Sequence, residues 1–257
     1  MQYKTLVIGS SFYNEFNLLG SLLALDEIYN LKNIKTYVSN STSCIVSLLM
    51  SLEIPIYEIA SFFNKNSIFY KNEDIISNNI ENRFQLLKIK TMLEEFIINK
   101  IKLIPKMYQL YTITGKKLYF MIQDQDENLD FFSYDSTPDM NCVDALLYSI
   151  NSKNIYEIPN SILPGNFYDS SILNPFPLDF IEDIESAIGL FTKFEIESND
   201  QKENLIVKLL NSRTKDISNR NTKHKIYNLN VKIYGFNDNI QNLIDGYFSF
   251  EEFMYQL

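Results

Sequence analysis

Histidine and glycine are scarce in this sequence, and each scarcity disfavours a class of functional site. The 257 residues include one histidine, His224, in a polar, basic stretch (222–225) that is typical of a surface loop. A Ser-His-Asp triad, or a metal site built from several histidines, is hard to assemble from it. The seven glycines fall well below average usage, which is roughly 7% of residues. Functions that need a glycine-rich loop are therefore disfavoured.

Cysteine is also rare, and long apolar runs are missing. The two cysteines, Cys44 and Cys142, lie inside apolar helical segments, and no basic-then-apolar signal precedes the first predicted strand. We therefore expect a reduced, intracellular (cytoplasmic) protein. The longest apolar run, around 44–59, is interrupted by serine, glutamate and proline, so no segment is predicted to span a bilayer.

Charge and length bound the partners and the domain count. The formal net charge is -9 and the pI is near 4.8, which disfavours nucleic acid or an anionic membrane held by overall electrostatics. With 46% hydrophobic residues, the chain has enough apolar surface for a sizeable core. We predict one α/β domain over 1–257, with an exposed loop near 64–79 and a poorly defined polar segment near 199–225.

The most informative stretch is 34–49, IKTYVSNSTSCIVSLL. A β-type run from Ile34 meets small residues at 39–43 and then an apolar run from Cys44, which predicts a strand, a sharp turn and a helix. Such a turn lifts its central residue, Ser41, over a helix N-terminus, where the helix dipole favours developing negative charge. The spacing is that of a nucleophile elbow with serine in the glycine positions. The alternative is an ordinary serine-rich turn before a helix.

The flanking segments indicate a parallel sheet. An apolar strand at 4–8 ends at Gly9, Ser10 and Ser11, and a helix with apolar residues at helical spacing follows over 16–31. Two consecutive β-loop-α units favour parallel strands, whose ligand sites lie at the carboxyl ends. Both Gly9–Ser11 and Ser41 follow such ends.

The remaining elements are predicted from periodicity and turn residues. Asp139 is expected at the N-terminus of the helix over 140–150, and the acidic hairpin at 124–130 lacks the spacing of a calcium loop, so we predict no metal site. Helices are predicted at 56–63, 80–101, 140–150, 180–193 and 241–255, and strands at 117–122, 131–134 and 226–234.

A second informative stretch is 165–179, GNFYDSSILNPFPLD. Phe167 and Tyr168 read as extended, Asp169 ends this piece, and two serines and a proline-closed turn follow. Asp at a strand end commonly satisfies its own backbone in an Asx-turn, which is the alternative to a functional carboxylate.

Together these segments resemble the patatin-like phospholipases over nearly the whole chain. The resemblance is carried first by 9–25, which ends in GSLLAL and contains the family's helix start at Gly20, and by the elbow. Later stretches that also carry it are LYTITGKKL, PDMNCVDALLYS, YDSSILNPFPLD and LIDGYFSFEEF. It implies a three-layer α/β fold with a mostly parallel sheet. It also implies a Ser-Asp dyad that works without histidine. The implied site residues are the nucleophile Ser41 and base Asp169, the oxyanion loop Gly9, Ser10, Ser11 and Phe12, and the elbow residues Ser39, Thr42 and Ser43.

The resemblance also implies an activity. Patatins are lipid acyl hydrolases of the phospholipase A type, so the expected substrate is a phospholipid or another fatty acyl ester, and no cofactor is expected. The richness in Asn, Ile, Lys and Tyr points to an AT-rich genome, and compact patatin-like proteins of this kind occur in large DNA viruses.

Serine replaces the family's glycine in all three motifs, namely the loop after the first strand, the elbow and the turn after Asp169, and Glu15 stands at another loop glycine. A side chain at a backbone that needs glycine costs about 1 to 2 kcal/mol, and a misplaced oxyanion donor costs about 10²- to 10³-fold in rate. These departures favour a weakened or inactive protein used as a structural or binding component, such as a virion protein, with protein partners or self-association. The alternatives are an active hydrolase using Ser41 and Asp169, and an acyl-chain binder without turnover.

Overall fold

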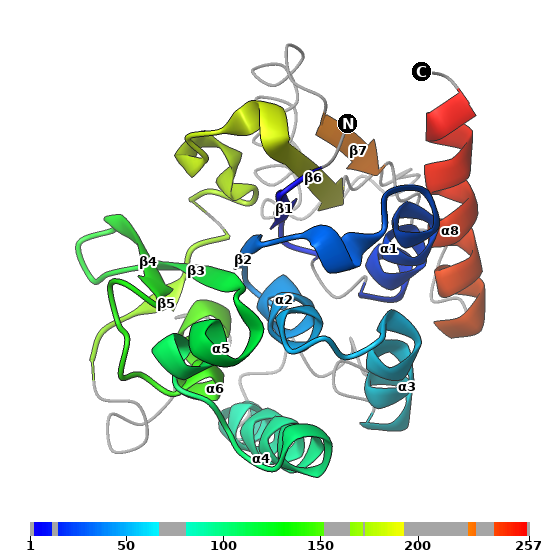
Figure 1. Cartoon of the computed structure of the whole chain (residues 1–257). Helices are drawn as coiled ribbons and strands as arrows, with labels where there is room; N and C mark the ends of the chain where they lie inside the picture. Colours follow the sequence, from blue (N-terminus) through cyan, green and yellow to red (C-terminus); the bar gives the residue numbers. More distant parts are fainter. Residues whose placement is uncertain are drawn as a thin grey trace, which may run out of the picture.

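The computed structural model describes residues 3–11, 15–66, 81–151, 165–171, 173–192, 226–229 and 239–255 (Figure 1). The polar segment expected near 199–225 lies outside the described residues, and so does most of the loop expected near 64–79. The helix before that loop, α3 (Ile56–Asn66), ends at Asn66 rather than at Phe63.

The strands are β1 (Thr5–Ile8), β2 (Thr36–Asn40), β3 (Lys117–Gln123), β4 (Leu129–Ser133), β5 (Tyr168–Asp169), β6 (Ala187–Thr192) and β7 (Ile226–Leu229). The helices are α1 (Glu15–Tyr29), α2 (Ser43–Ser51), α3, α4 (Glu81–Ile101), α5 (Met107–Thr114), α6 (Cys142–Ile150) and α8 (Asn239–Tyr255). Short 3₁₀ turns form η1 (Leu31–Asn33), η2 (Pro177–Phe180) and η3 (Ile184–Ser186).

The strands form one sheet in the order β4-β3-β2-β1-β6-β7, and β5 pairs with β3. The neighbours from β3 to β7 run parallel, whereas β4 and β5 run antiparallel to β3. This confirms the predicted mixed α/β fold with a mostly parallel central sheet flanked by helices. In the register of β1 and β2, Ile8 pairs with Ser39. The residues that follow these strands, Gly9 and Ser41, therefore leave the same edge of the sheet.

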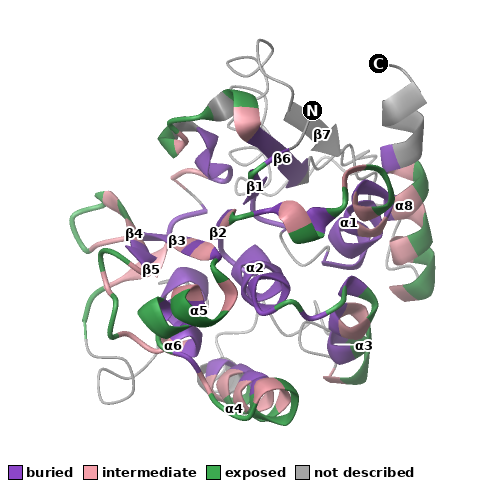
Figure 2. Cartoon of the chain, viewed as in Figure 1, coloured by how far each residue is buried: buried purple, intermediate pink, exposed green. Residues whose placement is uncertain are grey.

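Side chains of the central strands alternate between two apolar clusters, as the pleat of a sheet requires. Leu6 and Ile8 of β1 belong to the large cluster formed with the helices, whereas Val7 belongs to a smaller cluster on the other face. In the described part of the chain, Phe176 and Leu178, at and beside η2, cover that second face. The burial of the central strands is visible in Figure 2.

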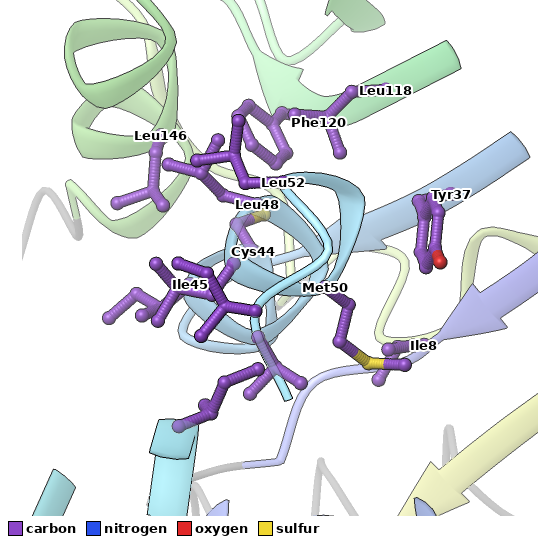
Figure 3. Packing of buried hydrophobic residues seen from close by; sticks show 14 of the residues in the cluster. Ile8, Tyr37, Cys44, Ile45, Leu48, Met50, Leu52, Leu118, Phe120 and Leu146 are labelled. Atoms are coloured by element: carbon purple, nitrogen blue, oxygen red, sulfur yellow. The ribbon is translucent and has the colours of Figure 1, made fainter. Parts of the chain in front are cut away.

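The helix α2 is buried along its whole length. Figure 3 shows Ile45 and Leu48 of α2 in one apolar cluster with Phe120 of β3 and Leu146 of α6. A helix packed on all sides cannot shift easily, because interiors are close-packed. The turn at its N-terminus, which carries Ser41, is therefore held in place by the core.

Both cysteines are free thiols in the core. Burial raises the pKa of the Cys44 thiol to about 12, although hydrogen bonds with Ser149 and Ser39 oppose this effect. Burial also raises the pKa of the Cys142 thiol. Because the thiolate is the reactive form, neither cysteine competes with a serine as nucleophile at neutral pH.

The helix predicted over 180–193 is wrong. The chain there forms η3 and then β6, which pairs with β1 in the middle of the sheet. The run AIGLFT of β6 is apolar nearly throughout, so it lacks the alternation that identifies a half-exposed strand. Gly189 has a packing role, since a Cβ there would lie 2.5 Å from the Phe176 ring.

Two local predictions also need correction. A helix, α5, occupies the region before Gly115 for which the sequence predicts none, and Gly115 ends it with φ 66. The N-cap of α6 is Asn141, whose side chain accepts a hydrogen bond from the Val143 N–H, rather than Asp139. Asp139 is instead exposed and lies 3.0 Å from the Lys106 ammonium group. Asn141 precedes the first helical residue directly, and asparagine caps as well as aspartate.

Two glycines bring α1 and α8 into contact, and the helices lie side by side in Figure 1. A Cβ on Gly20 would lie 2.0 Å from the Leu243 carbonyl oxygen, and one on Gly246 would lie 2.1 Å from the Asn17 carbonyl oxygen. The Ser21 hydroxyl donates to the Gly246 carbonyl at 2.7 Å. The resemblance implies a helix start at Gly20, but α1 begins at Glu15, so Gly20 lies inside the helix.

We expect Gly246→Ala to destabilise the protein by about 1 to 3 kcal/mol, because the added methyl group forces two backbones apart. Helix propensity alone predicts the opposite sign, since replacing a mid-helix glycine by alanine normally stabilises by about 0.5 to 1 kcal/mol. Urea unfolding measures the difference. Ile244→Ala is the control on an exposed position of the same helix. A Gly246→Ala protein as stable as the wild type would contradict the close contact.

Candidate active site

The turn between β2 and α2 has the geometry of a nucleophile elbow. β2 ends at Asn40, α2 begins at Ser43, and Ser41 between them adopts φ 54, a left-handed conformation that is uncommon outside glycine. Ser41 is only 6% exposed. The turn therefore holds one serine in a strained backbone conformation beside a helix N-terminus, as such elbows do.

The serines that replace the elbow glycines are not strained. Neither Ser39 nor Ser43 has a positive φ, and the same holds for Ser10, Ser11, Ser170 and Ser171. The expected cost of a side chain at these positions is therefore wrong, since strain arises only where φ is positive. Their hydroxyls bond locally instead. The Ser43 hydroxyl donates to the Gly9 carbonyl at 2.7 Å, and the Ser170 hydroxyl donates to the Met121 carbonyl at 3.2 Å.

Asp169 is carried by the short strand β5. β5 pairs antiparallel with the end of β3, with Asp169 opposite Ile122, and the Asp169 N–H donates to the Asn151 carbonyl at 2.9 Å. The turn that follows closes through the Asn174 N–H, which donates to the Ser170 carbonyl at 2.8 Å. Sheet pairing on one side and a closed turn on the other hold the position of the carboxylate.

The two oxygens of Asp169 have different partners. Oδ2 accepts a hydrogen bond from the Ser41 hydroxyl at 2.7 Å, and Oδ1 accepts one from the Ser171 N–H at 2.8 Å. The Asx-turn expected as an alternative is thus present, but it uses only one oxygen. The other oxygen is bonded to Ser41, although the two residues are 128 positions apart in the chain.

Burial raises the pKa of the Asp169 carboxyl above its ordinary value of 3.8, and hydrogen bonds from Ser41 and Ser171 oppose this effect. A carboxylate with a raised pKa is a stronger base. It accepts a proton from a neighbouring hydroxyl more readily than an exposed aspartate does. The arrangement can therefore orient Ser41 and take its proton.

Asn40 and Asn174 join the elbow to the turn after Asp169. The Asn40 side-chain amide donates to the Asn174 carbonyl at 2.6 Å, and the Asn174 side chain accepts from the Phe176 N–H at 3.0 Å. Sequence reasoning does not single out Asn40. Its position directly before Ser41 was the available signal, together with the Asn-x-Pro pattern that contains Asn174.

The loop after β1 is hydrogen-bonded to β6 and to the turn after Asp169. The Gly9 N–H donates to the Leu190 carbonyl at 2.9 Å, and the Ser10 N–H donates to the Pro175 carbonyl at 2.8 Å. Gly9 has no room for a side chain, since a Cβ would lie 2.8 Å from the Phe191 ring. Phe12, expected in the same loop, lies outside the described residues.

Ser11 completes the described part of this loop. Its hydroxyl donates to the Glu15 carboxylate at 3.0 Å and lies 3.0 Å from the Thr42 hydroxyl. Within the described chain, neither the Ser11 N–H nor the Thr42 N–H has a hydrogen-bond partner. Both groups are therefore available to bind an oxygen atom, which is the requirement for an oxyanion hole.

A surface hollow of about 430 Å³ lies elsewhere, between α3 and α4. It includes none of the predicted site residues. On α4, Leu93 and Ile97 are fully buried, as expected of a covering helix, whereas Met92 and Phe96 line the hollow. The full lining is Glu58, Ser61, Phe62, Lys65, Asn66, Met92, Glu95, Phe96, Asn99 and Lys100.

In the residues that the structure describes, no three His, Cys, Asp or Glu side chains are grouped in a way that could hold a metal ion. None of the described helices combines the length and the apolar character that crossing a membrane requires. In the acidic hairpin, Asp126 and Glu127 are exposed, and Asp124 accepts hydrogen bonds from the N–H groups of Asp126 and Asn128.

No family model matches the chain. Among curated proteins, the chain is similar to "Probable lipid hydrolase 463L" of Invertebrate iridescent virus 6. The two are 24% identical over 241 residues, which cover 89% of this chain and 77% of the viral protein.

Solved structures share the fold. VipD from Legionella pneumophila matches 100% of this chain and 67% of its own with a TM-score of 0.59 and 14% identity. ExoU, in its complex with SpcU from Pseudomonas aeruginosa, matches 99% of this chain with a TM-score of 0.55 and 14% identity. This chain spans about half of that protein, 52%. The chain thus has the patatin-like fold that its resemblance to the patatin-like phospholipases implies.

Proposed function

We propose that this protein is an active serine lipid acyl hydrolase that cleaves a fatty acyl ester or phospholipid, with Ser41 as nucleophile and Asp169 as base. The observation that carries the proposal is the hydrogen bond of 2.7 Å from the Ser41 hydroxyl to Asp169 Oδ2. A nucleophile within hydrogen-bond reach of its base is the geometric requirement for this chemistry. The similarity to a probable lipid hydrolase supports the substrate class.

In the acylation step, the Ser41 hydroxyl proton moves to Asp169 Oδ2 while Ser41 Oγ attacks the ester carbonyl carbon. The carbonyl π electrons move to oxygen and form a tetrahedral oxyanion. When the oxyanion collapses, the bond to the alcohol oxygen breaks, and the leaving alcohol takes the proton from Asp169. The product of this step is an acyl group esterified to Ser41.

In the deacylation step, Asp169 takes a proton from water, and the hydroxide formed attacks the acyl carbon. The second tetrahedral oxyanion expels Ser41 Oγ, which recovers its proton from Asp169. The fatty acid leaves, and both side chains return to their starting protonation states. One base therefore serves both steps, so the reaction needs neither a histidine nor a metal ion.

The developing oxyanion needs N–H donors, and the proposal assigns this role to the backbone around Ser41. Thr42 follows the nucleophile at the N-terminus of α2, where an elbow supplies one donor. Ser11 supplies an N–H from the loop after β1. Both N–H groups lack a hydrogen-bond partner among the described residues, which supports this assignment.

A patatin-like protein that binds lipids or other proteins without turnover is the competing function. The observation that favours it is the hydrogen bond from the Ser10 N–H to the Pro175 carbonyl, because this N–H is then not available to an oxyanion. The loss of the loop glycines favours the same reading. The two functions differ in one measurable property, the reactivity of Ser41.

We expect purified wild-type protein to be labelled by a fluorescent fluorophosphonate and to hydrolyse a short-chain fatty acyl ester. These probes report only serines whose hydroxyl is activated by a base. Digestion of the labelled protein and peptide mass spectrometry should find the modification on Ser41. Heat-denatured protein is the control for non-specific labelling. A folded protein with neither labelling nor ester hydrolysis would overturn the proposal and leave the binding function.

A further inference from the structure

We propose that Thr42, Ser11 and Glu15 form a side-chain latch that positions the loop after β1 against the nucleophile elbow. The inference rests on the proposed function, since it concerns the placement of the two candidate oxyanion donors. The latch joins three segments: the loop that follows β1, the turn that precedes α2, and the first residue of α1. All three members are buried, at 7%, 0% and 2% exposure for Thr42, Ser11 and Glu15.

The direction of the hydrogen bonds in the latch is determined by the number of hydroxyl protons. The Ser11 hydroxyl has one proton, which it donates to Glu15 Oε1 at 3.0 Å. In its 3.0 Å contact with Thr42, Ser11 must therefore accept, and Thr42 must donate. The chain of donation runs from Thr42 through Ser11 to Glu15, so the carboxylate orients both hydroxyls.

The position of Glu15 suits a buried carboxylate. Glu15 is the first residue of α1, where the helix dipole favours negative charge. Its carboxylate is bonded to the Ser11 hydroxyl. The negative charge of Glu15 is therefore stabilised by the start of a helix and by a hydroxyl group.

The latch acts on the residues that carry the free N–H groups. Ser11 and Thr42 each supply one candidate oxyanion donor, and the hydrogen bond between their hydroxyls joins the two residues. A second contact, from the Ser43 hydroxyl to the Gly9 carbonyl at 2.7 Å, ties the same two segments. Side-chain hydrogen bonds thus hold a loop that lacks its family's glycines, and Thr42, Ser11 and Glu15 act as positioning residues.

The first test compares Thr42→Val with Thr42→Ser. Valine keeps the shape of threonine without its hydroxyl, whereas serine keeps the hydroxyl without the methyl group. We expect kcat for a fatty acyl ester to fall about 10- to 100-fold in Thr42→Val, less than the 10²- to 10³-fold cost of losing an oxyanion donor, with KM little changed. Thr42→Ser should lose much less kcat than Thr42→Val, because its hydroxyl can still donate to Ser11. An unchanged kcat in Thr42→Val, or an equal loss in both variants, would overturn the latch.

The second test is a double-mutant cycle with Ser11→Ala. If Ser11 and Thr42 act as one unit, the double variant loses no more kcat than Thr42→Val alone. A loss in the double variant equal to the product of the two single losses would overturn the proposal. Glu15→Gln, which keeps an acceptor oxygen, should retain most of the activity that Glu15→Ala loses, and equal losses would overturn the role of Glu15. An unreactive wild type overturns the proposed hydrolase, whereas a reactive wild type with an unaffected Thr42→Val variant overturns only the latch.

Discussion

Ser41→Ala is expected to lower kcat for a fatty acyl ester by about 10⁴-fold or more, because removing the nucleophile of a serine hydrolase leaves only residual catalysis. Fluorophosphonate labelling should disappear with it. The Ser41 hydroxyl donates to Asp169 Oδ2 at 2.7 Å, which places it beside the proposed base. Initial rates of ester hydrolysis and in-gel fluorescence measure the two effects.

The matched control is Ser47→Ala, the same substitution at a serine inside α2. Ser47 is fully buried, and its hydroxyl has no hydrogen-bond partner, so its loss leaves the elbow intact. We expect this variant to keep wild-type labelling and turnover. Residual Ser41-independent hydrolysis in Ser41→Ala, at a rate near that of Ser47→Ala, would show that another residue is the nucleophile.

Asp169→Asn is expected to lower kcat by about 10²- to 10⁴-fold, the usual contribution of a general base. Asparagine has the shape of aspartate and keeps an oxygen that can accept from the Ser171 N–H, but it cannot take the Ser41 proton. Stopped assays at several substrate concentrations separate this loss of kcat from any change in KM. Asp126→Asn, an exposed carboxylate in the hairpin, is the control and should leave both values unchanged.

The same substitution should raise the melting temperature at neutral pH, because the pKa of the Asp169 carboxyl is raised in the folded protein by burial. A carboxyl group whose pKa is raised in the folded protein destabilises the fold at pH values above that pKa. Below pH 3.8, the ordinary pKa, the group is protonated in both the folded and the unfolded protein and has no effect on stability. The stabilisation in Asp169→Asn therefore grows as the pH rises through the folded pKa. Wild-type activity falls as the pH decreases through the same value, since the base becomes protonated.

Calorimetry at acidic and at neutral pH tests this prediction. We expect Asp169→Asn and the wild type to melt alike at the acidic pH and the variant to melt higher at the neutral pH. Asp126→Asn should follow the wild type at both. A variant that melts below the wild type at neutral pH would mean that the hydrogen bonds of the carboxylate outweigh the effect of burial.

Local patterns in the sequence were sufficient for the elbow and for most elements. The change from a β-type run to small residues and then to an apolar helix predicts the turn at Ser41, and the structure has β2, the turn and α2 in that order. Two β-loop-α units predict the parallel pairing of β1 and β2. These predictions succeed because strand, turn and helix preferences act over a few neighbouring residues.

Sequence patterns were insufficient where packing decides the conformation. β6 is a central strand with an apolar run, and its period does not distinguish a strand from a buried helix. The cost assigned to the serines in glycine positions was likewise wrong, since the backbone at Ser39 and Ser43 never reaches a positive φ. The φ angle depends on how the turn before α2 packs against β1 and against the turn after Asp169. Residue types alone do not specify this packing.

By itself, the sequence determined an α/β chain with a mostly parallel sheet, and its resemblance to the patatin-like phospholipases predicts Ser41 and Asp169 as the two members of a dyad. Only the tertiary structure decided that the two side chains meet at 2.7 Å, and that Ser11 and Thr42, which are 31 residues apart, meet at 3.0 Å. The physical reason is that the donor–acceptor distance of a hydrogen bond can vary by only a few tenths of an ångström. Contacts between distant segments reach that precision only through the sheet register and the packed core.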